Sequence, residues 1–198
     1  MSENKMIKEF IVNSETGLIK PAKLYLSPNR DSRPDNSIVE LVLLHGISLP
    51  PGQFGGPGVE ALFLNKLDCN AHPYFEGIHG MRVSAHLFIR RDGELLQFVP
   101  FNERAWHAGE SYFRGRSRCN DFSIGIELEG EDKINYDDRQ YNILSEVLMA
   151  LMKAYPQLTM REFVGHSDVA SSRKSDPGPA FDWLNLYNRI NRLKENKI

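Results

Sequence analysis

The first long apolar segment of the chain is IVELVLL, residues 38–44, in which every residue but one is isoleucine, valine or leucine. Such a run is typical of a strand that other structure covers on both faces. His45 follows directly, at the carboxyl end of this strand, where α/β sheets tend to bind their ligands. The pattern predicts a buried strand that brings a histidine to a functional edge.

The rest of the chain alternates between two periodicities. Apolar residues recur at helical spacing in some segments, and strand-like segments lie between them. Asp92-Gly93 separates two strand-like segments, which predicts a hairpin. Strands that alternate with helices, together with one hairpin, predict a single-domain α/β fold with a central mixed β-sheet flanked by helices. The expected helices are 59–67, 137–155 and 181–196, and the expected strands are 38–44, 82–91, 94–101, 122–130 and 162–166.

Residues 27–37, SPNRDSRPDNS, are rich in turn-forming residues and are expected to form a loop. We therefore expect residues 1–37 to be an N-terminal segment and loop packed on one domain, residues 38–198. A chain of 198 residues with 41% hydrophobic residues is long enough to bury one sizeable core.

Charge and composition argue against some partners. The 24 Lys and Arg residues against 26 Asp and Glu give a net charge of -2 without a basic tract, so nucleic acid is not an expected partner. No run of ~18 apolar residues could span a membrane, and the first 20 residues lack the ~7 apolar residues of a signal peptide. Cys69 and Cys119 lie far apart in sequence, which favours reduced thiols in the cytoplasm over a disulfide framework, although two cysteines could also pair. We also expect a monomer.

The segment GHSDVASSRKSDPGPAFDW, residues 165–183, concentrates candidate chemistry. His166 follows an expected strand, as His45 does, so the two histidines could be neighbours. Two imidazoles and a carboxylate are usual ligands of a catalytic zinc ion. Asp168 and Asp176 both qualify as the carboxylate. The proline after Asp176 fixes its backbone, and Asp168 could instead cap the next turn, but the residue types leave the choice open.

A different metal is also conceivable. His166-Ser167-Asp168 is an H-x-D triplet, and two histidines with one carboxylate also describe the facial triad of non-haem iron oxygenases. Such enzymes take their second histidine downstream of the triplet, and no histidine follows His166. We therefore rank iron below zinc.

Five segments carry a resemblance to a known family: HGISLPPGQFGGPGVEALF, RVSAHLFIRRDGELLQFVPF, RAWHAG, RCNDFSIGIELEG and GHSDVASSRKSDPGPAFDW. In order and spacing they resemble the zinc-dependent N-acetylmuramoyl-L-alanine amidases of type 2. Within that family they are most similar to the cytosolic enzymes that act on 1,6-anhydro-N-acetylmuramoyl-L-alanine. The resemblance covers about residues 38–190 and implies a fold like that of peptidoglycan-recognition proteins.

By position, the resemblance implies one zinc ion per chain, held by His45, His166 and Asp176. It places the catalytic glutamate on Glu127 and the catalytic lysine on Lys174. Zinc acidifies water and polarises a carbonyl, a glutamate can carry the proton to the leaving amine, and a lysine can stabilise the developing oxyanion. Without the resemblance, Glu127 would be interpreted as a surface carboxylate on an edge strand and Lys174 as a solvated loop cation.

Substrate contacts are expected from two sets of residues. The segment RAWHAG places Trp106 and His107 in a loop after the hairpin, where their ring faces could stack on a sugar or peptide plane. The resemblance implies that Arg82 and Arg118 bind carboxylates of the stem peptide. The alternatives are core packing for Trp106 and a solubilising role for the arginines.

The implied function is hydrolysis of the amide between 1,6-anhydro-N-acetylmuramic acid and L-alanine, with an anhydromuropeptide as substrate, in peptidoglycan recycling. Two alternatives are an amidase that acts on polymeric peptidoglycan and a non-catalytic peptidoglycan-recognition module. Gly46 departs from the asparagine usual in the family. The missing side-chain amide could alter substrate affinity but not the zinc chemistry.

Overall fold

The structure is a computed structural model that describes residues 9–196, so residues 1–8 of the expected N-terminal segment lie outside it. Its centre is a six-stranded mixed sheet in the order β12-β5-β11-β6-β7-β3. Strands β12, β5, β11 and β6 run parallel, whereas β7 is antiparallel to β6 and β3 parallel to β7. The strands are β3 (Lys23–Leu24), β5 (Leu41–Ile47), β6 (Leu87–Ile89), β7 (Leu95–Gln97), β11 (Ser123–Glu129) and β12 (Phe163–Gly165). The predicted α/β fold with a central mixed sheet is confirmed.

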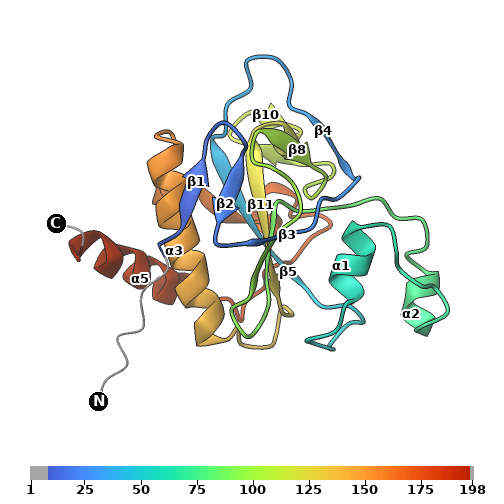
Figure 1. The fold of residues 1–198 in the computed structure, drawn as a ribbon. Coiled ribbons are helices and arrows are strands. Elements are labelled where there is room, and N and C mark those ends of the chain that lie inside the picture. The colour runs from blue at the N-terminus through green and yellow to red at the C-terminus, as the bar shows by residue number, and fades with distance from the viewer. Residues whose placement is uncertain (1–8, 197–198) are drawn as a thin grey trace.

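Helices cover the sheet on two sides (Figure 1). On one side, α3 (Asp138–Ala154) packs against α5 (Trp183–Glu195) and against the sheet. On the other side, α1 (Gly58–Phe63) packs over β6 and β7. The short helices are α2 (Pro73–Glu76) and α4 (His166–Val169), with 3₁₀ turns at Cys119–Asp121 and Met160–Glu162.

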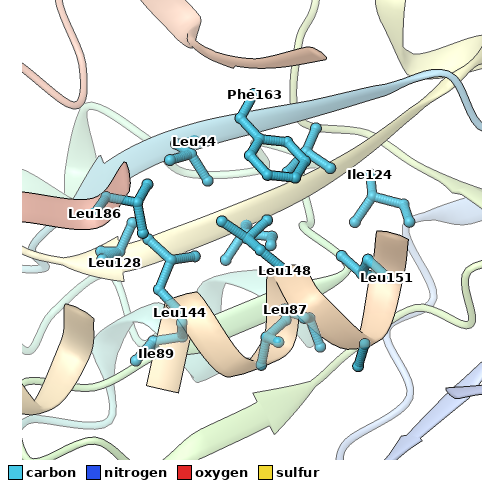
Figure 2. Packing of buried hydrophobic residues seen from close by; sticks show 14 of the residues in the cluster. Leu44, Leu87, Ile89, Ile124, Leu128, Leu144, Leu148, Leu151, Phe163 and Leu186 are labelled. Atoms are coloured by element: carbon cyan, nitrogen blue, oxygen red, sulfur yellow. The ribbon is translucent and has the colours of Figure 1, made fainter. Parts of the chain in front are cut away.

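The largest hydrophobic core lies between α3 and the sheet. Leu144, Leu148 and Leu151 project from one face of α3, as their helical spacing predicts. Figure 2 shows them against side chains of the strands, among them Leu44, Leu87 and Leu128, with Leu186 of α5 beside them. Alternation along β5 and β11 sends Leu44 and Leu128 to this face, so the residues next to them in sequence face the other way.

Three small two-stranded sheets were not expected from the sequence. They are β1 (Ile11–Asn13) with β2 (Leu18–Lys20), β4 (Arg30–Ser32) with β8 (Glu103–Ala105), and β9 (Tyr112–Phe113) with β10 (Arg116–Ser117). The expectation that 27–37 is only loop is therefore wrong at β4. Its pairing with β8 comes with ion pairs from Arg30 to Glu103 at 2.8 Å and from Arg104 to Asp31 at 2.6 Å. These partners lie about seventy residues away, so no local pattern reveals them.

Candidate metal centre and active site

Two parallel strands bring His45 and His166 to the same edge of the sheet. Gly165 of β12 lies opposite Leu44 of β5, so His45 in β5 and His166 just after β12 are neighbours. Their Nδ1 atoms are 3.0 Å apart, and Asp176 Oδ2 lies 3.1 Å from each of them. Both histidines are buried and Asp176 is half-buried. Within residues 9–196, this is the one group of His, Cys, Asp and Glu side chains that could hold a metal ion.

The donor atoms of this cluster fit a cation. His166 Nε2 lies 3.2 Å from the carbonyl oxygen of Ala108. A carbonyl only accepts, so in the neutral ring this nitrogen carries the proton and Nδ1 offers its lone pair. Burial lowers the pKa of His45 to about 4, so this ring is neutral at pH 7. Neutral imidazoles and a carboxylate that converge on one point are a ligand set that zinc prefers.

Asp168 does not join the cluster. Its Oδ2 accepts a hydrogen bond of 2.7 Å from the backbone N–H of Gly165, at the start of α4. Asp168 is the third residue of α4 and so caps the start of its own helix, whereas the sequence suggests that it caps the turn that follows. Of the two aspartates that the residue types could not separate, the structure therefore brings only Asp176 to the histidines.

His107 lies against the outer nitrogen of His45. Its Nδ1 is 3.0 Å from His45 Nε2, and its Nε2 is 3.3 Å from the Ser123 hydroxyl oxygen. Gly125 makes room for the ring, because a Cβ there would lie 2.5 Å from it. Burial lowers the pKa of His107 well below its usual value, so the ring stays neutral and can accept the proton of His45. An outer partner of this kind fixes the tautomer and direction of a metal-binding histidine.

Glu127 lies opposite His45 across the β5–β11 pair. Strand β11 is flanked by β5 and β6, so the alternative of a surface carboxylate on an edge strand is wrong. Glu127 is only 9% exposed, and its buried Oε2 has no hydrogen-bond partner within the described part of the chain. Burial raises its pKa well above the usual value, the charge of Asp176 raises it further, and the charge of Lys174 opposes both. A buried carboxylate with a free oxygen is typical of a group that exchanges protons in a reaction.

A cleft of about 550 Å³ opens over these residues. The candidate metal ligands, Glu127 and Lys174 line its polar part. Apolar side chains on and around α1 and α2 line another part, among them Leu62, Phe63 and Tyr74. The cleft thus combines a few polar groups with an apolar wall, as small-molecule sites commonly do.

The other residues expected to bind substrate are spread over a wider area. Trp106 and Arg118 line a separate pocket of about 270 Å³. The Arg118 side chain is 70% exposed and pairs with Asp121 at 3.3 Å. Arg82 is exposed. His107 lines the cleft, although both of its ring nitrogens already face protein partners. Substrate contact by these four residues therefore stays a prediction.

Tyr136, which no pattern in the sequence singled out, lies after β11 and is buried close to the cluster. Its hydroxyl donates a hydrogen bond of 2.9 Å to the carbonyl oxygen of Pro177, the residue after Asp176. Two glycines, Gly46 and Gly130, leave space for its ring and hydroxyl. The two glycines could have indicated a close approach by another group, but nothing in the sequence identified Tyr136 as that group.

Comparison with known proteins agrees with this geometry. Residues 35–179 match the sequence profile of a family described as N-acetylmuramoyl-L-alanine amidase. This chain belongs to that family. It is 54% identical over 169 residues to the 1,6-anhydro-N-acetylmuramyl-L-alanine amidase AmpD of Citrobacter freundii, covering 85% of this chain and 90% of the relative. Identity to the AmpD protein of Escherichia coli K12 is also 54%, covering 85% of this chain and 92% of the relative.

Solved structures of the family share the fold. A crystal structure of a selenomethionine derivative of AmpD superposes with a TM-score of 0.87 at 51% identity, covering 91% of this chain and 99% of that one. AmpDh3 of Pseudomonas aeruginosa, solved in complex with an anhydromuramic pentapeptide, gives a TM-score of 0.59 at 29% identity, covering 76% of this chain and 59% of that one. The chain is thus an amidase by family, and the cluster, Glu127 and Lys174 share one cleft. No helix within residues 9–196 is long and apolar enough to cross a membrane.

Proposed function

We propose that this protein is a zinc-dependent amidase that hydrolyses the bond between 1,6-anhydro-N-acetylmuramic acid and the L-alanine of the stem peptide. The observation that carries the proposal is the convergence of His45 Nδ1, His166 Nδ1 and Asp176 Oδ2 to about 3 Å, beside the buried free oxygen of Glu127. The relatives named as 1,6-anhydro-N-acetylmuramyl-L-alanine amidases support the choice of substrate.

Zinc would be held by His45, His166 and Asp176, one ion per chain. When bound, it would acidify a water molecule and polarise the scissile carbonyl. His107 and the Ala108 carbonyl would keep the two imidazoles in the tautomer that leaves Nδ1 free.

Glu127 would accept a proton from the attacking water and pass it to the amine of L-alanine as the C–N bond breaks. Its free oxygen and raised pKa suit a group that must first take and then return a proton. Lys174 would stabilise the negative charge that develops on the carbonyl oxygen. The Lys174 charge also acts on Glu127 and favours the ionised form in which Glu127 can act as a base.

Substrate contacts would extend beyond the catalytic groups. We propose that Arg82 and Arg118 bind carboxylates of the stem peptide, and that Trp106 and His107 contact its sugar or peptide planes. The chain would act as a monomer in peptidoglycan recycling in the cytoplasm. Both described cysteines are free thiols, which fits a reducing compartment.

The decisive experiment is mass spectrometry of a reaction with 1,6-anhydro-N-acetylmuramoyl tripeptide, run with and without a zinc chelator. We expect free tripeptide and anhydromuramic acid, and no products after chelation. Parallel reactions with intact sacculi test for action on polymeric peptidoglycan. If zinc-loaded protein binds the 1,6-anhydro-N-acetylmuramoyl tripeptide but does not cleave it, the protein is a recognition module and not an amidase.

A further inference from the structure

Tyr136 connects the segment after β11 to the loop that carries Asp176. The side chain is 6% exposed, and its hydroxyl donates to the Pro177 carbonyl oxygen at 2.9 Å. Burial raises the pKa of Tyr136 above its usual value, so the hydroxyl keeps its proton as a donor. Because Pro177 is bonded directly to Asp176, this hydrogen bond acts one residue away from a proposed zinc ligand.

The hydroxyl occupies a space that the chain keeps open at Gly46, the residue after His45. A Cβ at Gly46 would lie 2.2 Å from the Tyr136 hydroxyl oxygen. The next nearest atoms would be Tyr136 Cζ at 3.4 Å and Pro177 Cα at 3.6 Å, which are ordinary contacts. Of these three atoms, only the Tyr136 hydroxyl oxygen would have to shift to admit a Cβ at position 46.

Other contacts hold the same loop on its remaining sides. The Asp176 carbonyl oxygen accepts a hydrogen bond of 3.0 Å from the N–H of Ser167, and the Ala180 N–H donates to the Asp132 carbonyl oxygen at 2.9 Å. A Cβ at Gly165 would lie 2.8 Å from Pro177 Cδ. Backbone contacts thus fix the loop at the start of α4 and at Asp132, and the Tyr136 hydroxyl fixes it between them.

We propose that Tyr136 is a positioning residue for Asp176, and that Gly46 is glycine because the Tyr136 hydroxyl fills the space of its side chain. This inference rests on the proposed function in that Asp176 must be a zinc ligand. It gives Gly46 a role in the metal site, whereas the sequence suggested only a lost substrate contact. It also requires Gly46 and Tyr136 to be coupled, since the hydroxyl is what a side chain at 46 would displace.

The first test compares zinc affinities by competition with a chromogenic chelator. Tyr136→Phe should bind zinc about 10-fold more weakly, the lower end of the 10- to 100-fold loss typical for outer partners of metal ligands. The visible spectrum of the Co²⁺-loaded variant should also change, because it reports ligand geometry. Tyr141→Phe is the matched control. Like Tyr136, it packs its ring on Phe181, but its hydroxyl accepts from the Asp182 N–H at 2.7 Å, six residues after Asp176 in sequence.

The second test is a double-mutant cycle. Gly46→Ala should weaken zinc binding in the parent protein, but should have little effect in the Tyr136→Phe background, where the obstructing oxygen is gone. If Gly46→Ala alone is too unstable to measure, recovery of folding in the double variant would itself show the coupling, because the double variant removes the clash.

The outcomes separate the two proposals. Parent-like zinc affinity and Co²⁺ spectrum in Tyr136→Phe, or additive effects of the two substitutions, would overturn the positioning role while leaving the zinc site intact. Absence of zinc binding by the parent protein would overturn the proposed function, and the inference with it.

Discussion

Glu127 shows how the position of a strand changes the chemistry of an ordinary side chain. Glu127 and Glu129 share one face of β11, and both are buried. Glu129 accepts hydrogen bonds from the backbone N–H groups of Gly55 and Arg91, so it holds two loops in place. Glu127 keeps a free oxygen beside the candidate metal ligands. Both oxygens of Glu129 accept hydrogen bonds, whereas one oxygen of Glu127 accepts none within the described residues, so only Glu127 is available for chemistry.

Glu127→Gln should abolish turnover while zinc stays bound, since the amide cannot accept and return a proton. We expect a rate loss of 10²- to 10⁴-fold, measured together with zinc content by atomic absorption. The variant should also be more stable without metal. Because the folded state raises the pKa of Glu127 above its ordinary 4.5, stability of the parent falls as pH rises from 4.5 through the raised pKa.

Thermal unfolding of the metal-free protein, with chelator present, tests whether stability changes with pH in this direction. At pH 7 the Gln variant should unfold at a higher temperature than the parent, because the parent must bury the charge of Glu127 or take up a proton. At pH 4 the parent and the Gln variant should unfold at similar temperatures, because Glu127 is then mainly protonated in both the folded and the unfolded parent. Undiminished turnover would remove Glu127 as the base.

Lys174→Met should lower turnover by about 100-fold, with a smaller effect on KM, because the proposed charge acts on the transition state. It should also shift the pH dependence. Lys174 holds down the pKa of Glu127, so its removal raises that pKa, and the acidic limb of kcat should move to higher pH. Lys133→Met is the control, since Lys133 lines the same cleft but does not act on Glu127. Equal pH profiles for parent and Lys174→Met would contradict the assignment.

At the scale of elements, the alternation of side chains along β5 and β11 places core residues on one face of the sheet and candidate site residues on the other. Along β5, Leu44 faces α3 and α5, while His45 faces the cleft, and along β11 the same division holds between Ile126 and Glu127. One face of the central strands therefore packs the main core and the other carries the site. Changes in α3 should affect folding far more than catalysis.

Leu148→Ala tests this separation. Leu148 is fully buried in α3, so its truncation should reduce the free energy of unfolding by about 2–5 kcal/mol. Leu184 of α5 is 68% exposed, and its replacement by alanine should cost less than about 0.5 kcal/mol. Urea unfolding measures both. Below its unfolding transition, Leu148→Ala should retain parental kcat, and a large loss of kcat with the fold intact would show that α3 and the site are coupled.

At the scale of the whole molecule, the sequence predicted the elements that residues close together in the chain determine, but not the pairings between distant segments. The helix 137–155 and a buried strand near 38–44 were predictable because their apolar spacing lies within one segment. The bounds of the strand were wrong: Ile38 is exposed, and β5 runs from Leu41 to Ile47, so His45 lies within the strand and not after it. The pairing of β4 with β8 and the central place of β11 depend on distant partners, so periodicity could not reveal them. Residue types alone also left two candidate aspartates, because the choice depends on which one the Gly165 N–H binds.

Metal removal should destabilise the whole fold, because the proposed ligands join segments that are far apart in sequence. His45 and Asp176 are separated by 131 positions, and His45 and His166 by 121. An ion that binds only the native state stabilises it by ~2.7 kcal/mol at 100 times its Kd. For a chain of this size, a chelator should then lower Tm by about 5–10 °C. Asp176→Ala should melt at the same temperature with and without chelator. An equal drop in this variant would mean that the chelator acts elsewhere and that Asp176 holds no metal.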